Sequence, residues 1–350
     1  MFQNSGYVFS MTNAENNQIV VYARNMDGTL RLMQTYRTGG KGTGIQVTDP
    51  LMSQGSLLLL PDRQLLFAVN AGDNTVSSFF ITRTGELLLQ DIVYSGGVFP
   101  TCLAMGDDVL YVGNNGDQNS QIKSNIAGFQ ISCNGKLCHL PCITHSLSHP
   151  YARVACMVYS PAEQVLAVSE LNFNRITVFS IGCSQELTNM TVNASNGAGP
   201  FGSAFQKNGV LLVTEAGAGA LSSYMVMQQN DIAVISGSVT NAQSATCWIS
   251  LNKQQTVAYT SNAGTDTISI YDITQQGSLT LRKNVLSDPN GTAAPLDSAV
   301  SEDGRNLYVL NGNEGSISVF QITDQGDLLL LQVLQDTGLP AIGAQGIAAL

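Results

Sequence analysis

Few residues in this chain carry charge, and few are of the types that usually bind metals. Only 11% of the 350 residues are charged, three are histidine and one is tryptophan. Scarce histidine argues against a histidine-rich metal site, so we expect no metal and no cofactor. The net charge of −10 argues against nucleic acid and anionic membranes as partners, because both need a basic surface. A small-molecule ligand is favoured, and a protein partner stays open.

Long apolar runs and helical periodicity are also missing. No run is long enough to span a bilayer, and the first residues lack the charged head and apolar core of a secretory signal. The chain as given is therefore expected to be cytoplasmic, with a secreted or periplasmic location open if a signal peptide has been removed. With 44% hydrophobic residues and 34 glycines, the composition favours a sheet protein with a large core.

A repeat runs through nearly the whole sequence. Seven times an aromatic residue is followed eight positions later by leucine or isoleucine, and the aromatics are 57, 50, 50, 45, 47 and 49 residues apart. A period of about 50 residues is the length of one four-stranded propeller blade. The seven aromatics are Tyr22, Phe79, Phe129, Phe179, Tyr224, Tyr271 and Phe320. The sequence predicts an all-β, seven-bladed propeller of four-stranded antiparallel blades, forming a single domain over residues 1–350.

The ends of the chain and one irregular unit complete this prediction. The N-terminal unit lacks an innermost strand, and residues 339–349 resemble the missing piece, so pairing the C-terminal strand with the N-terminal blade is expected to close the ring. In the third unit, Asn114 lies fifteen residues before its aromatic, where other units have nine. The extra residues fall in 116–124, which is polar and predicts an enlarged surface loop.

Two groups of residues resemble chemical motifs. Cys133, Cys138 and Cys142, with His139 between the last two, could bind a soft metal or hold a disulfide, but the spacing is not that of a zinc ribbon, and ordinary thiols on an outer hairpin are favoured. The glycines of residues 197–202 match the letters of a dinucleotide fingerprint. A strand follows them in place of a helix, so we interpret the segment as a turn between blades.

Two kinds of loop are expected to meet around the central channel on one face of the ring. One leads into each inner strand and the other leaves each second strand, and ligands usually bind in such a concave mouth. His149, Tyr151 and Arg153 precede the fourth inner strand. Ligand contacts are expected from Tyr151, Phe201, Trp248 and Asp297, which lie at or near the starts of inner strands.

The last residues of the second strands follow a pattern with two exceptions. Asparagine stands there in five units, whereas the neighbouring fourth and fifth units carry Glu170 and Glu215. Asparagine there is interpreted as a cap for the following loop. Two carboxylates in adjacent blades could form an acid and base pair, or they could accept the same loop hydrogen bonds as asparagine. Arg153 could brace the channel in an ion pair or stabilise an oxyanion.

The repeats resemble those of a known family. Leu66-Phe-Ala-Val-Asn70, Ala258-Tyr-Thr-Ser-Asn262 and Leu307-Tyr-Val-Leu-Asn311, each with its following aromatic, look like repeats of the seven-bladed lactonase family. That family includes propeller-type 6-phosphogluconolactonases and fungal 3-carboxy-cis,cis-muconate lactonizing enzymes, and the chain resembles in particular bacterial lactonase-like propellers without an assigned substrate. The resemblance implies a catalytic role for Glu215. It also implies a histidine near the start of the fourth inner strand, where this chain has Arg153, and a basic residue after Pro200, where this chain has none.

Two hypotheses about function follow. The first is a metal-independent hydrolase or cyclising enzyme for a small lactone or its open acid, in which Glu215 moves the proton, Glu170 or His149 assists, and Arg153 stabilises the carbonyl oxygen. The second is a non-catalytic propeller that binds a ligand or a protein through the same face.

Overall fold

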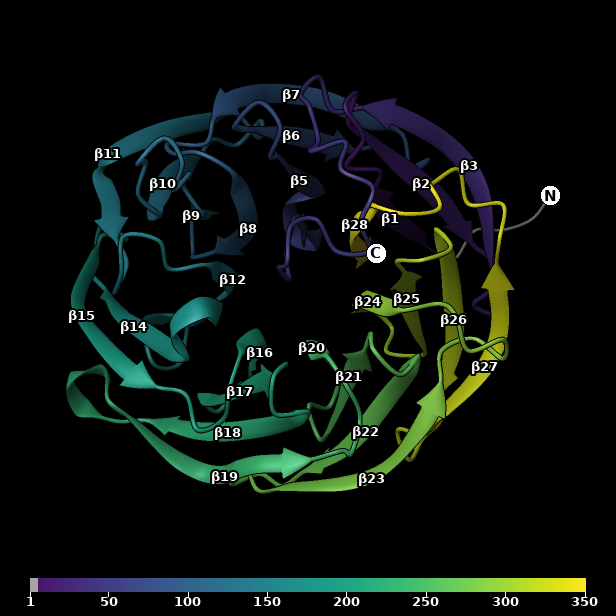
Figure 1. Cartoon of the computed structure of the whole chain (residues 1–350). Coiled ribbons are helices and arrows are strands. Elements are labelled where there is room, and N and C mark those ends of the chain that lie inside the picture. Colours follow the sequence, from purple (N-terminus) through teal and green to yellow (C-terminus); the bar gives the residue numbers. More distant parts are fainter. Residues whose placement is uncertain (1–5) are drawn as a thin grey trace.

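The computed structural model describes residues 6–350, which form a ring of seven four-stranded antiparallel sheets (Figure 1). Each sheet is a meander whose first strand lies at the centre of the ring and whose last strand lies at its rim. The predicted all-β, seven-bladed propeller is confirmed. Residues 1–5 of the predicted domain lie outside the described residues.

The strands are numbered along the chain, and the blades are numbered from the N-terminus. Blade 1 contains β28 (Gln345–Ala349), β1 (Tyr7–Met11), β2 (Gln18–Arg24) and β3 (Leu30–Arg37); blade 2 contains β4 (Leu57–Leu60), β5 (Leu65–Asn70), β6 (Thr75–Ile81) and β7 (Leu87–Tyr94); blade 3 contains β8 (Pro100–Met105), β9 (Val109–Asn114), β10 (Asn125–Ile131) and β11 (Leu137–Ser146).

The remaining four blades follow in chain order. Blade 4 contains β12 (Val154–Ser160), β13 (Val165–Glu170), β14 (Arg175–Ile181) and β15 (Leu187–Ala194); blade 5 contains β16 (Pro200–Phe205), β17 (Val210–Glu215), β18 (Ala220–Val226) and β19 (Ile232–Thr240); blade 6 contains β20 (Thr246–Leu251), β21 (Val257–Asn262), β22 (Thr267–Ile273) and β23 (Leu279–Leu286); blade 7 contains β24 (Pro295–Val300), β25 (Asn306–Asn311), β26 (Ser316–Ile322) and β27 (Leu328–Leu334).

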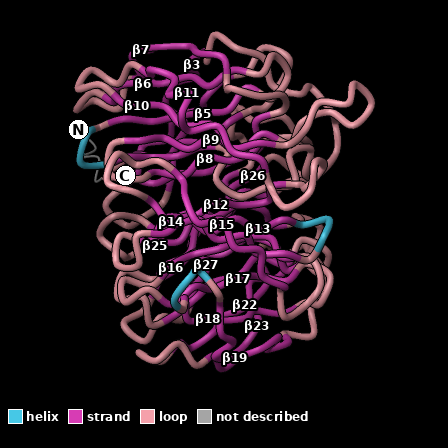
Figure 2. The backbone as a smooth tube through the Cα atoms, turned by 90° about the vertical axis from the view of Figure 1, so that its left-hand side faces the viewer, coloured by secondary structure: helices cyan, strands magenta, loops and turns pink. Residues whose placement is uncertain are grey.

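Helix is confined to three short 3-10 turns in the part of the chain that the structure describes. They are η1 (Pro61–Arg63), η2 (Leu171–Phe173) and η3 (Gln228–Asn230). At three residues each, none of the helices within residues 6–350 could cross a bilayer. Loops gather at both ends of the strands, as the side view shows (Figure 2).

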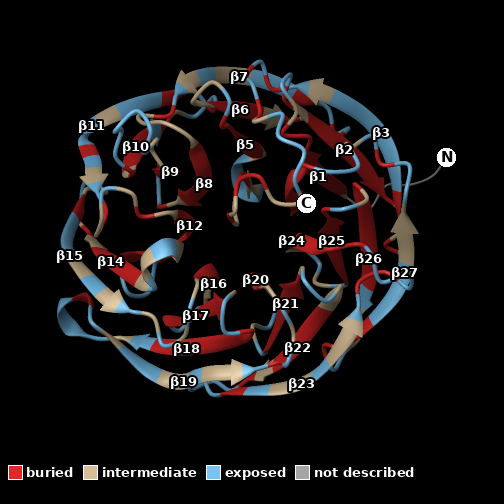
Figure 3. Cartoon of the chain, in the orientation of Figure 1, coloured by how far each residue is buried: buried red, intermediate tan, exposed pale blue. Residues whose placement is uncertain are grey.

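Burial follows the radial position of each strand. The second and third strands of the blades are almost entirely buried, whereas the rim strands are mostly exposed or partly exposed after their first residue (Figure 3). The seven repeat aromatics are at most 1% exposed, which explains the period seen in the sequence: each fills the same place between two blades. The predicted enlarged loop of blade 3 is also confirmed, because residues 115–124 connect β9 to β10.

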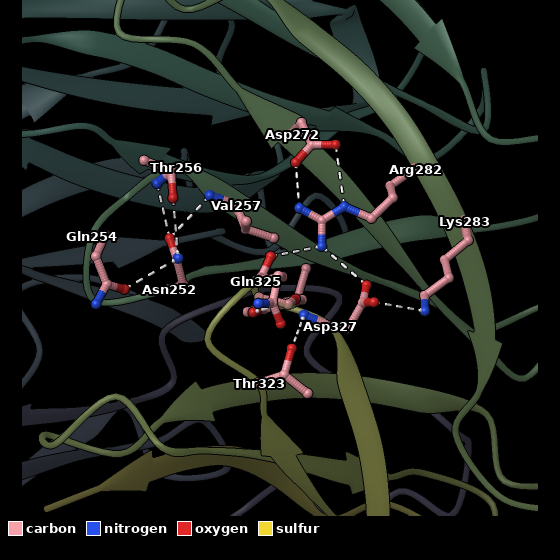
Figure 4. Close-up of polar contacts among 12 residues, drawn as sticks. Asn252, Gln254, Thr256, Val257, Asp272, Arg282, Lys283, Thr323, Gln325 and Asp327 are labelled. Atoms are coloured by element: carbon pink, nitrogen blue, oxygen red, sulfur yellow. Dashed lines mark hydrogen bonds and ion pairs between the residues drawn. The ribbon is translucent and has the colours of Figure 1, made fainter.

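Neighbouring blades are joined by polar contacts as well as by packing. The hydroxyls of four tyrosines donate to backbone carbonyls in the outer hairpin of the next blade, at 2.7 to 3.2 Å; they are Tyr7, Tyr111, Tyr259 and Tyr308. Closer to the rim, Arg282 of blade 6 contacts Asp272 in its own blade and Asp327 in blade 7, and Lys283 also reaches Asp327 at 3.2 Å (Figure 4). Every interface thus contains directional contacts in addition to apolar ones.

The connection between blades 1 and 2 fills the centre of the ring. Beside β5 the chain turns in toward the centre (Figure 1), and we call residues 49–55 the channel segment. Gln54 donates its backbone N–H to Ala155 of blade 4 at 2.8 Å, and its side-chain amide pairs with both the N–H and the carbonyl of Ile249 in blade 6. Leu103 of blade 3 donates to the carbonyl of Gly55 at 2.9 Å. The channel segment therefore links inner strands that would otherwise face one another across open space.

Ring closure uses the two ends of the described chain. β28 pairs antiparallel with β1, and Tyr7 and Leu350 exchange two backbone hydrogen bonds of 3.2 and 2.8 Å. The C-terminal strand is therefore the innermost strand of blade 1, as the sequence predicted, and the inner edge of β1 is covered.

Removing β28 should open the ring. A chain ending at Ala344 leaves the buried edge of β1 unpaired, and we expect it to melt more than about 10 °C below the full chain, because several kilocalories per mole of pairing and burial are lost. Far-UV circular dichroism during heating measures this. A chain lacking only Leu350 is the control and should melt within about 4 °C of the full chain, since only two hydrogen bonds are removed. Equal melting of both truncations would contradict the role given to β28.

Candidate functional site

One backbone position recurs at the start of the inner strands. In five blades the carbonyl of the residue before the inner strand accepts a hydrogen bond of 2.8 to 3.1 Å from the first N–H after the second strand. This bond joins the two loops that meet on the channel face. The five residues are Phe99, Arg153, Gly199, Ala245 and Ala294.

Two of these five residues depart from the small side chains found in the others. Glycine or alanine stands there in blades 5, 6 and 7, with positive φ angles of 72°, 55° and 50°. Phe99 also has a positive φ, 58°, and its N–H is held by the side-chain oxygen of Asn74 at 2.8 Å. A bulky residue in the left-handed region costs about 1 to 3 kcal/mol, and such strain is concentrated at functional sites.

Both exceptions line the same cleft, which lies between blades 3 and 4 on the channel face. Its volume is about 250 Å³. The enlarged loop of blade 3 supplies another wall. The lining residues are Phe99, Asn115, Gly116, Asp117, Gln118, Tyr151, Arg153 and Asn172. Thus three departures from the repeat, two side chains and one loop insertion, converge in one place.

Arg153 is a cation without an ion-pair partner among the described residues. It appears in none of the salt bridges of residues 6–350, and its buried Nε has no hydrogen-bond partner there. Burial lowers the pKa of Arg153, while the nearby carboxylate of Asp49 opposes this effect. A partly desolvated guanidinium without a bound carboxylate is suited to bind an anionic or partly negative oxygen.

A second unsatisfied donor lies next to it. The Nδ2 of Asn115 is buried without a partner in the described chain, while Oδ1 of the same side chain accepts from the N–H of Val154 at 2.7 Å. That hydrogen bond fixes the amide against the residue that follows Arg153. Buried donors without partners are uncommon in folded proteins, and a ligand oxygen would satisfy them.

The other walls of the cleft combine a carboxylate with a braced aromatic ring. Hydrogen bonds from the Ser120 hydroxyl and the Asn119 N–H lower the pKa of Asp117, so this carboxylate is ionised at neutral pH. The N–H of Tyr151 donates to Nδ1 of His149 at 3.1 Å, and the His149 ring lies 4.0 Å from the ring of Phe173. His149 therefore supports the turn that carries Tyr151.

Neither Glu170 nor Glu215 is among the residues that line this cleft. Both are fully buried and occupy the place that asparagine has in other blades. In each case a hydroxyl seven residues later donates to the carboxylate at 2.6 Å: Thr177 for Glu170 and Ser222 for Glu215. In three of the five asparagine blades the equivalent contact runs the other way, as when Asn262 donates to Ser269 at 2.8 Å.

Loop groups complete the surroundings of the two carboxylates. Glu215 also accepts from the Gly197 N–H at 2.8 Å and the Ser238 hydroxyl at 2.6 Å, and Glu170 accepts from the N–H and hydroxyl of Ser148. Of the two interpretations made from the sequence, these contacts match the one in which glutamate takes over the loop hydrogen bonds of asparagine. The two side chains do not converge with Arg153 on the cleft.

Three of the residues expected to contact a ligand surround the channel segment. Trp248 is 2% exposed and donates its indole N–H to the carbonyl of Ser53 at 3.0 Å, with the ring of Phe201 packed edge-on at 5.0 Å. Asp297 is 6% exposed and accepts from the N–H groups of Ser298 and Gly55. The expected open mouth at the ring centre is filled by the chain itself, so of the four expected ligand contacts only Tyr151 lines the cleft.

The channel segment brings in a titratable residue that the sequence did not single out. Burial raises the pKa of Asp49 to about 7, opposed by the Met52 N–H and by Arg153. Burial also raises the pKa of Asp297 to about 7, and the charge of Asp49 adds to the effect. Asp49 is partly exposed to solvent, but burial is still the largest influence on its pKa. The 57-residue first interval, the longest of the six, was the available signal that blade 2 is preceded by extra chain.

The cysteines are free thiols. Cys133, Cys138 and Cys142 are exposed on the outer hairpin of blade 3, while the three cysteines of the inner strands are buried. No group of three or more His, Cys, Asp or Glu side chains within residues 6–350 is arranged to hold a metal ion.

A family model described as lactonase, seven-bladed beta-propeller, matches residues 52–340. The chain belongs to the seven-bladed lactonase family. The resemblance seen in the repeats is confirmed. No curated protein matches this lactonase-family chain at a significant level.

Several solved structures share the fold of this lactonase-family chain. The periplasmic gluconolactonase of Pseudomonas aeruginosa is 18% identical with a TM-score of 0.77, covering 99% of both chains. Putative 6-phosphogluconolactonases of Bacteroides uniformis and Bacteroides fragilis are each 16% identical, with TM-scores of 0.78 and 0.76; the matches cover 98% and 99% of this chain and 99% and 98% of those chains. At such identities the likeness establishes the fold alone.

Replacing Glu215 with glutamine should destabilise this lactonase-family propeller. One carboxylate oxygen becomes an NH₂ group facing a donor, which costs about 1 to 3 kcal/mol. Urea unfolding of E215Q against the parent measures the difference in the free energy of unfolding. E302Q, at an exposed position, is the matched control and should be neutral within about 0.5 kcal/mol. Equal stability of E215Q and the parent would contradict a hydrogen-bonding role for Glu215.

The contribution of Asp297 to the free energy of unfolding should fall as pH rises from about 4 to 7. Since folding raises the pKa of Asp297 from 3.8 to about 7, the folded state favours its neutral form, and this contribution is lost as pH rises through 7. D297N removes the ionisable group and should exceed the parent in stability at pH 8 by about 1 to 4 kcal/mol, with the gain vanishing near pH 4. Urea unfolding at both pH values tests this. D62N, on the exposed η1, should show no such gain; a parallel response of both variants would contradict the assignment.

Proposed function

We propose that this propeller hydrolyses a small lactone, or catalyses the reverse ring closure, in the cleft between blades 3 and 4. The observation that carries the proposal is the convergence of three departures from the repeat, Phe99, Arg153 and the enlarged loop, on one concave site. Phe99 is strained, and the structure shows no hydrogen bond or ion pair of the Arg153 side chain to another described residue that would explain its place in the scaffold. Membership in the lactonase family and the gluconolactonase names of structural relatives support the choice of reaction.

The groups in the cleft suit attack of water on a lactone carbonyl. The guanidinium of Arg153 and the amide of Asn115 would donate to the carbonyl oxygen as it gains negative charge. Asp117 would accept a proton from the attacking water. As the ring C–O bond breaks, that proton would pass to the ring oxygen and leave the open hydroxy acid. Ring closure is the same sequence in reverse.

The carboxylates expected from the sequence to move protons would then have a supporting role. Glu215 and Glu170 already accept three hydrogen bonds each, and Nδ1 of His149 accepts from Tyr151. Their participation in catalysis remains a prediction that the assay below tests directly through E215Q.

Arg153→Ala should abolish most of the activity. In a screen of small lactones followed by proton release, we expect kcat/KM to fall about 100-fold, the usual loss when one oxyanion donor is removed. Arg37→Ala removes the same charge from an exposed site on β3 and should leave kcat/KM unchanged.

The outcomes separate the alternatives. Full activity in R153A would place catalysis elsewhere. Unchanged activity in E215Q, measured at a temperature where it is folded, would remove Glu215 from the mechanism. Ligand binding at the cleft without turnover of any lactone would favour the non-catalytic propeller.

A further inference from the structure

The charges around the cleft are unfavourable for a doubly charged ligand. Arg153 is the only cation among the residues that line it, and Asp117 lines it as an ionised carboxylate. Asp49 lies within electrostatic range of Arg153 and partly compensates its charge. Phosphate groups usually require several cations or backbone N–H groups, because they carry close to two negative charges at neutral pH. The cleft has one cation and at least one opposing carboxylate.

Two unsatisfied donors belong to residues that line the cleft. Arg153 Nε and Asn115 Nδ2 are both buried without partners in the described chain. They sit on residues held together by the hydrogen bond from Val154 to Asn115. A carboxylate accepts two such bonds at once, and a lactone presents its carbonyl oxygen to the same donors.

Aromatic side chains form the apolar part of the cleft. Phe99 has its backbone in the left-handed region, and the ring of Tyr151 lies 6.1 Å from that of His149, so two aromatic side chains line the cleft and can pack against a ring of the ligand. The volume of about 250 Å³ corresponds to roughly eight water molecules at about 30 Å³ each, enough for one ring with a few substituents.

We infer that the cleft selects a monocarboxylate that bears a flat ring, or the matching lactone, over phosphorylated sugar acids. This inference rests on the proposed function in that it takes the cleft as the substrate site. It differs from what the names of the sugar-lactonase relatives suggest, because charge and aromatic lining together disfavour a polar, phosphorylated chain.

Isothermal titration calorimetry with three probes tests the selectivity on the intact chain. Benzoate carries the ring and the carboxylate, gluconate the carboxylate without a ring, and 6-phosphogluconate adds the phosphate. We expect benzoate to bind at least tenfold more tightly than either sugar acid at low ionic strength. Tightest binding of 6-phosphogluconate, or no binding of benzoate at millimolar concentration, would overturn the inference.

Three variants separate recognition from folding. N115D keeps the oxygen that accepts from Val154 but removes the free donor and adds a charge, so benzoate affinity should fall at least tenfold. F99G relieves the left-handed strain, which partly offsets the lost packing, so the melting temperature should stay within about 4 °C while benzoate affinity drops several-fold. D117N should raise the affinity for 6-phosphogluconate by a larger factor than that for benzoate, because the carboxylate repels the doubly charged phosphate more strongly than a single carboxylate. Unchanged benzoate affinity in both N115D and F99G would place its binding outside the cleft and overturn the inference.

Failure of this inference is distinguishable from failure of the proposed function. Hydrolysis of lactones without inhibition by benzoate would overturn the ligand class and leave the reaction standing. Benzoate binding that depends on Asn115 and Phe99, without hydrolysis of any lactone, would support the ligand class and overturn the reaction.

Discussion

The hydrogen bonds between the channel segment and the inner strands are the constraint on which the rest of the site depends. Inner strands of a propeller have one paired edge and one edge facing the centre, where their polar groups need partners. Here Gln54 and Gly55 supply partners to blades 3, 4 and 6 at the ring centre. Two of those strands, β8 and β12, begin directly after Phe99 and Arg153. The channel segment therefore contacts the inner strands that carry two of the cleft residues.

Function in this propeller is best located by where the repeat is broken. Positions that keep their residue type in every blade, such as the interblade aromatics, serve packing. The Glu170 and Glu215 substitutions preserve the hydrogen-bonding pattern by reversing its direction, so a change of charge there is compatible with an unchanged scaffold. Phe99, in contrast, places a bulky side chain where the left-handed backbone favours small residues, and Arg153 places a charge where the equivalent residues of blades 5, 6 and 7 are glycine or alanine. A substitution that adds no contact to the fold indicates a ligand site more strongly than one that keeps the hydrogen bonds of the fold.

The sequence was sufficient for the fold because the period of about 50 residues, the turns and the closing strand all point to one architecture. It also placed Tyr151 and Arg153 just before the fourth inner strand, where both line the cleft. It could not give the path of the chain before blade 2, since a polar linker has no periodicity to follow, and so it placed Trp248 and Asp297 at an open mouth. The unusual size of Phe99 could have been recognised from the sequence. Phe99 precedes Pro100, whereas the small residues Gly199 and Ala294 precede the equivalent prolines. The left-handed backbone conformation of Phe99 could not be predicted from the sequence.

The pairing of β28 with β1 also has a consequence for how the protein is made. Six blades are built from contiguous stretches and can form as soon as they leave the ribosome, whereas blade 1 needs the last strand to be synthesised. Until then β1 presents an unpaired, apolar edge next to an incomplete ring. Contacts between sequence ends so far apart form slowly, because the whole chain must be ordered first. Until β28 has been synthesised, the nascent chain thus carries an exposed strand edge that can pair with other chains.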